Sequence, residues 1–121
     1  MLEAGFVAAL VAGLAALAAG WSLVPLDVLL FAGIQLVVAG LVFGVPTGLA
    51  YHVALGRSLQ RAGRLPPRWW LQPTRLHDRI PAQDRARVLA WCYAGAAGFV
   101  VTAVGCALGA LAAARLVLGA D

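Results

Sequence analysis

Three long stretches of this chain carry no charged residue, and they limit its fold more than any other feature. They cover residues 4–26, 28–56 and 88–114. Each is longer than the roughly 20 residues that a helix needs to cross the hydrocarbon core of a bilayer. Charged residues make up only 12% of the 121 residues, too few to cover a soluble domain of this size. The sequence therefore predicts an all-α integral membrane protein with three transmembrane helices, in a single membrane domain over residues 1–121.

The boundaries of these helices follow from the residues between the apolar stretches. We expect a first span over residues 2–23 and a second over residues 26–51, with a helical extension to residue 62. Pro25 suits the start of the second helix, and Gly63 suits its end. Residues 63–80 should form a structured loop, because Pro66 and Pro67 exclude a continued helix. The third helix should start near residue 81 and cross the membrane over residues 88–114.

The distribution of arginine predicts the orientation in the membrane. Eight of the nine arginines lie between Arg57 and Arg87, and the chain has no lysine. Basic residues concentrate on the cytoplasmic side of membrane proteins. This loop is therefore predicted to be cytoplasmic, with the N-terminus inside and the C-terminus outside. Arginine without lysine is typical of a GC-rich bacterial genome, so we expect a multi-pass protein of the bacterial cytoplasmic (inner) membrane.

Glycines at helical spacing predict where the helices pack. Small residues four apart form a flat ridge along which two membrane helices approach closely. The second helix has two overlapping GxxxG steps and the third helix has another. The predicted packing residues are Gly40, Gly44, Gly48, Gly105 and Gly109. The same faces would also serve a homo-oligomer.

The loop between the second and third helices is the strongest local signal for binding. Arginine and tryptophan dominate the energetics of protein interfaces, and arginine beside a membrane also attracts anionic lipid headgroups. We therefore expect this region to contact other membrane protein subunits, anionic lipids or both. A juxtamembrane position makes nucleic acid an unsuitable partner. The predicted docking residues are Arg57, Arg61, Arg64, Arg68, Trp69, Trp70, Arg75 and Arg79.

Two histidines are candidates for a chemical role. His52 is followed by Gly56 and Arg57, a short pattern that is weakly similar to the haem-ligand region of the membrane anchors of succinate dehydrogenase. The resemblance implies His52 as a candidate haem or quinone ligand in an anchor with three spans. His77 precedes Asp78, but adjacent residues on a helix do not face each other, so a structural role is expected for this pair.

The functional prediction rests on residue types that the sequence lacks. The middle of each span lacks the charged residue that an ion-coupled transporter or proton relay usually needs. The sequence also presents no catalytic constellation, so we expect no enzyme activity and no cofactor. The favoured hypothesis is a non-catalytic accessory subunit or assembly factor of a larger membrane complex. The alternatives are a haem- or quinone-binding anchor of a respiratory complex and a self-associating, holin-like pore.

Overall fold

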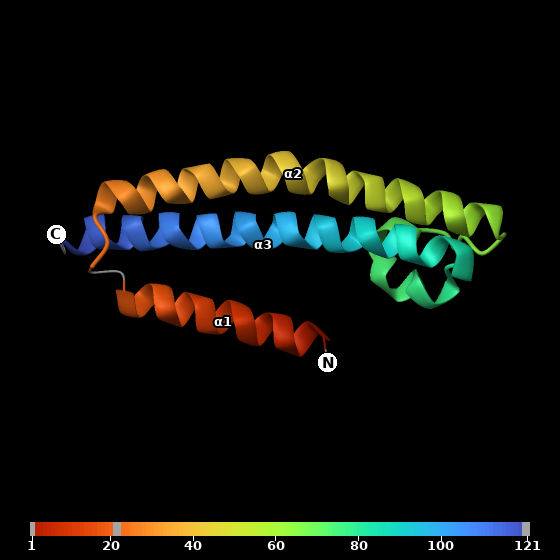
Figure 1. Cartoon of the computed structure of the whole chain (residues 1–121), viewed down its shortest axis with the longest axis horizontal. Helices are drawn as coiled ribbons and strands as arrows, with labels where there is room; N and C mark the ends of the chain where they lie inside the picture. The colour runs from red at the N-terminus through yellow and green to blue at the C-terminus, as the bar shows by residue number, and fades with distance from the viewer. Residues whose placement is uncertain (1, 21–22, 120–121) are drawn as a thin grey trace. The chain divides into compact units, whose positions relative to one another are not determined.

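The chain is built from helices. The computed structural model describes residues 2–20 and 23–119, and these residues form no strand. The three long helices are α1 (Leu2–Gly20), α2 (Leu26–Arg61) and α3 (Ala82–Leu118) (Figure 1). Two short 3-10 helices, η1 (Trp69–Leu71) and η2 (Pro73–Arg79), lie between α2 and α3. The predicted all-α class is therefore confirmed.

Two of these helices are long and apolar enough to cross a membrane. Only 17% of the most apolar window of α2 and 22% of that of α3 is buried. Core helices of soluble proteins are mostly covered, so these exposed apolar surfaces are unlike a soluble core. Helix α1 contributes a shorter apolar stretch, Ala4–Ala16. It ends at Gly20, where the amide of Leu23 donates to the Gly20 carbonyl, and residues 21 and 22 of the predicted first span lie outside the described part of the chain.

The chain divides into two compact units, each containing part of α2 and part of α3. The first unit comprises Met1–Ala39 and Val101–Asp121. In this unit Leu29 of α2 packs against Leu108 and Ala112 of α3. A Cβ atom added to Gly105 would lie 2.7 Å from the backbone nitrogen of Val37, so the two helices touch through their backbones there.

A buried arginine joins the two ends of this first unit. Arg115, in the last turn of α3, is buried and donates a hydrogen bond to the carbonyl of Val24. Val24 lies just before α2. A cation near the C-terminus of a helix also interacts favourably with the helix dipole. The interaction therefore fixes the start of α2 beside the end of α3.

The second unit, Gly40–Val100, contains the closest helix contact of the described residues. A Cβ atom added to Gly98 of α3 would lie 2.3 Å from the Cα atom of Gly44 in α2. One turn away, a Cβ atom on Gly95 would lie 3.3 Å from the Cα atom of Gly48. Close backbone approach of this kind is the packing that glycine allows between membrane helices.

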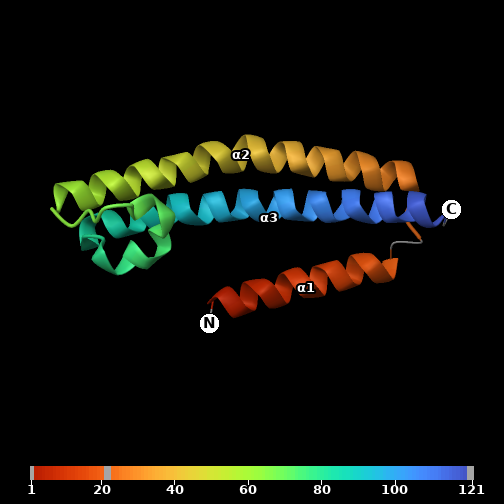
Figure 2. The same ribbon diagram turned by 180° about the vertical axis from the view of Figure 1, so that it is seen from behind.

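Residues 63–80, which we call the arginine loop, fold back onto α2 and α3 within the second unit (Figures 1 and 2). Their apolar side chains complete a core with the ends of the two long helices. The loop supplies Leu76 and Ile80 to this core, which also contains Tyr51, Leu55, Leu59 and Val88. The loop is thus a packed element and not a free connection.

The sharp end of α2 sets the direction of the loop. Gly63 has a φ of 65°, a left-handed conformation that favours glycine. Its amide donates to the Gln60 carbonyl and the amide of Arg64 donates to the Leu59 carbonyl, at 3.1 and 2.9 Å. This pair of bonds is a Schellman motif, which satisfies the last carbonyls of the helix. The chain therefore turns back toward the helices directly after Arg61.

Candidate functional site

A tryptophan placed over a glycine holds the start of the arginine loop against α2. A Cβ atom added to Gly56 would lie 2.8 Å from a carbon of the Trp69 ring. The ring also contacts His52, with 6.3 Å between the two ring centroids. Only glycine at position 56 leaves room for this approach. Trp69, one of the predicted docking residues, is therefore partly used to anchor the loop.

A hydrogen bond between Tyr51 and His77 anchors the second half of the loop. The hydroxyl of Tyr51 and Nε2 of His77 are 2.6 Å apart. A neutral imidazole accepts this bond from the tyrosine when its proton is on Nδ1. Burial lowers the pKa of His77 below its ordinary value of 6.5, and the Arg85 charge adds to this effect while Asp78 opposes it. His77 therefore anchors the loop to α2 through Tyr51, and Asp78 is not its only polar neighbour.

Because of this histidine, we expect the arginine loop to open in acid. Because the pKa of His77 is lower in the folded chain than in the unfolded chain, the folded state binds fewer protons. Stability from this group is complete above pH 6.5 and is lost as the pH falls from 6.5 through the lower folded-state pKa. The protection factors of the amides of residues 69–80, which compare measured exchange with the intrinsic rate at each pH, should thus fall on acidification. The His77→Gln variant keeps an acceptor but cannot titrate, so an equal fall in this variant would contradict the assignment.

The half-buried carboxylate of Asp84 joins the start of α3 to the end of α2. Ser58 is 0% exposed, and its hydroxyl donates to Asp84 at 2.8 Å. Asp84 also faces Arg87 at 3.2 Å and Arg61 at 3.9 Å. Leaving a buried hydroxyl without a partner costs about 1–3 kcal/mol. Asp84 therefore both satisfies Ser58 and positions two arginines at this end of the helices.

His52, the candidate cofactor ligand, lies half-buried beside the loop. Its Nδ1 donates to the backbone carbonyl of Gly48 at 2.9 Å. Its ring meets Tyr51 edge-on, with 5.3 Å between centroids. The contacts of His52 with Gly48 and Tyr51 lie within α2, and its contact with Trp69 links α2 to the loop. Among residues 2–20 and 23–119, no three His, Cys, Asp or Glu side chains are grouped so as to hold a metal ion.

One face of the loop forms a basic and apolar depression, which we call the loop groove. It has a volume of about 380 Å³. Arg68 lies in the left-handed region with a φ of 56°, which is uncommon for a residue with a side chain. Beside the groove Trp70 is 57% exposed, and Leu71 on its wall is 66% exposed. The groove is lined by Pro66, Pro67, Arg68, Trp69, Leu71, Gln72, Arg75, Leu76 and Arg79.

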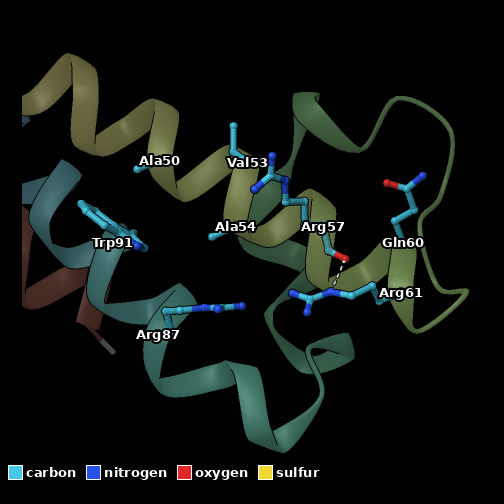
Figure 3. A pocket seen from close by; sticks show the side chains of 8 residues that line it. All are labelled: Ala50, Val53, Ala54, Arg57, Gln60, Arg61, Arg87 and Trp91. Carbon is cyan, nitrogen blue, oxygen red and sulfur yellow. Dashed lines mark hydrogen bonds between the residues drawn. The ribbon is translucent and has the colours of Figure 1, made fainter.

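A second depression, which we call the helix groove, lies between α2 and the start of α3 (Figure 3). It has a volume of about 600 Å³. Arg57 and Arg61 extend into it from α2, while Arg87 and Trp91 extend from α3 (Figure 3). The helix groove therefore combines charge at one end with an apolar floor.

The structure thus places most of the predicted docking residues in one of the two grooves. Arg57 and Arg61 line the helix groove, and Arg68, Trp69, Arg75 and Arg79 line the loop groove. Arg64 lines neither groove and donates to the carbonyl of Arg79 at 3.3 Å.

Sequence reasoning missed two members of the helix groove, Arg87 and Trp91. Their spacing of four residues on a helix was a usable signal, because it matches the spacing of Arg57 and Arg61 on the facing helix. Two such pairs can line one groove from its two sides.

Comparison with known proteins adds no relative. The chain matches no protein-family model, no curated protein and no solved structure.

Proposed function

We propose that this chain is a non-catalytic small subunit or assembly factor of a larger complex in the bacterial cytoplasmic membrane. It binds its partner through the loop groove on the cytoplasmic side. The observation that carries the proposal is an ordered loop that presents three arginines beside exposed apolar side chains, Trp70 and Leu71.

Residence in a membrane is supported by the surfaces of α2 and α3. Large apolar side chains such as Phe31, Val42 and Phe99 are more than half exposed on these helices. Monomeric soluble proteins rarely expose continuous apolar patches larger than a few hundred Å². Lipid or neighbouring helices would cover these surfaces, and α1 would add a third span.

The orientation is supported by the position of the charges. The end of α2, the arginine loop and the start of α3 together contain Arg57 to Arg87, which are eight of the nine arginines. The positive-inside rule places this end in the cytoplasm. The N-terminus is then cytoplasmic and the C-terminus lies outside.

The chemistry of the loop groove specifies its partner. Three guanidinium groups favour carboxylates, which they can bind with two parallel hydrogen bonds. Proline, tryptophan and leucine walls favour apolar side chains. The partner is therefore a protein segment that alternates acidic and apolar residues, at the cytoplasmic face of a neighbouring subunit.

Blue-native electrophoresis of mildly solubilised native membranes tests this proposal. We expect the chain to migrate in a species much larger than itself, and carbonate washing to leave it in the membrane. Migration only as a free small species would contradict the accessory role. Release by carbonate would contradict membrane residence separately.

A further inference from the structure

The helix groove differs from the loop groove in what it can bind. Arg61 and Arg87 extend toward each other from the two helices, the guanidinium of Arg57 lies beside Val53, and Ala50 and Trp91 lie toward the other end (Figure 3). The groove extends along α2 from Ala50 to Arg61. At a rise of about 1.5 Å per residue, this is a length of about 16 Å.

The charged end of the helix groove has an excess of positive charge. Three arginines line it and one carboxylate, Asp84, lies within 4.0 Å of two of them, which leaves a net charge of +2. Asp84 also accepts the hydrogen bond of Ser58. No acidic side chain among the described residues lies within that distance of Arg57. The phosphodiester of a phospholipid carries one negative charge and would offset half of this excess.

The guanidinium groups approach the groove from two sides. Arg61 is held by a hydrogen bond from its Nε to the carbonyl of Arg57, at 3.3 Å (Figure 3). Arg87 donates a hydrogen bond to Asp84. Arginine binds phosphate oxygens through its planar fork of donors. Donors that are already oriented lose less entropy when a ligand binds.

The other end of the groove is unsuited to a soluble anion. Its floor consists of Ala50, Val53 and Ala54, and Trp91 forms its wall. Tryptophan is enriched where a membrane meets water, because its ring is apolar and its N–H is polar. A molecule that fills the whole groove therefore has an anionic head and a hydrocarbon body.

We propose that the helix groove binds an anionic membrane phospholipid. The phosphate lies between Arg57, Arg61 and Arg87, and the first methylene groups of an acyl chain lie against Val53 and Trp91. This inference rests on the membrane residence proposed above, but it does not require the protein partner. The lipid would fill the space between α2 and α3 and fix the orientation of the arginine loop at the membrane surface.

Native mass spectrometry of the purified full-length chain tests the proposal. The chain is titrated with phosphatidylglycerol and with phosphatidylcholine in detergent. We expect retention of phosphatidylglycerol to exceed that of phosphatidylcholine by about tenfold or more, since each arginine near a lipid phosphate contributes roughly fivefold. The variant Arg57→Gln/Arg61→Gln/Arg87→Gln should lose this preference. Arg57→Gln alone should lower it by about fivefold, and it leaves the Asp84 network intact.

A matched variant separates a built site from general charge attraction. Arg68→Gln/Arg75→Gln/Arg79→Gln removes the same charge from the loop groove and should keep the preference for phosphatidylglycerol. An equal loss in both triple variants would overturn the site. Displacement of the lipid by millimolar inorganic phosphate or glycerol phosphate would also overturn it, because the ligand would then be a soluble phosphate. The purified chain contains no partner, so these outcomes are independent of the electrophoresis result.

Discussion

Replacing Gly98 by leucine should destabilise the folded chain by about 3 kcal/mol or more, the upper end of what inserted bulk costs in a packed core. A Cβ atom at this position would lie 2.3 Å from the Cα atom and 2.8 Å from the nitrogen of Gly44. Both are backbone atoms, so no side-chain rotation can relieve the clash. The helices must separate, and the dispersion contacts along their shared face are lost.

A glycine on the facing helix provides the control for this prediction. A Cβ atom added to Gly48 meets nothing within 4 Å, so Gly48→Ala should leave stability unchanged or raise it by up to about 1 kcal/mol. Reversible unfolding in detergent, followed by circular dichroism, measures both variants. Equal stability of Gly98→Leu and the unaltered chain would contradict the close contact.

The glycine pattern shows which part of the helix packing could be predicted from the sequence. Helical spacing indicated that Gly44 and Gly48 share one face of α2, which the structure places against α3. It could not indicate the residues opposite them, Gly95 and Gly98, because spacing within one helix says nothing about which face of another helix it meets. The helical class and the two long apolar helices could be predicted, because both depend on local composition.

The contacts that hold the arginine loop could not be predicted. Tyr51 meets His77 and Ser58 meets Asp84, in both cases across 26 residues of chain. Of these four residues only His77 was singled out from the sequence, and neither pair was predicted, because both pairs depend on tertiary packing. The proline pair and the tryptophans did indicate that the loop is ordered.

A second large effect is expected at the loop groove. Arg68→Gln/Arg75→Gln/Arg79→Gln should move the chain out of its larger complex, because the acidic segment of the partner loses three charge-assisted contacts. Interface arginines are often among the few residues that carry most of the binding energy. The helix-groove triple, Arg57→Gln/Arg61→Gln/Arg87→Gln, removes the same charge elsewhere and should leave the complex largely assembled.

The two triple variants should therefore have opposite effects. One should lose the partner and keep the lipid, and the other should lose the lipid and keep the partner. Equal loss of the complex in both would mean that the partner responds to net charge and not to the loop groove. The comparison uses the full chain in native membranes, with total helix content as the check on folding.

Photo-crosslinking from position 71 is the most direct test of docking through the arginine loop. Leu71 lines the loop groove and is 66% exposed, so benzoylphenylalanine fits there without disturbing the core. Irradiation of native membranes should give one discrete adduct with a neighbouring subunit, which disappears in the Arg68→Gln/Arg75→Gln/Arg79→Gln background. The same probe at Gln83, an exposed residue outside both grooves, should give none. No adduct from position 71, or equal adducts from both positions, would contradict the proposed docking surface.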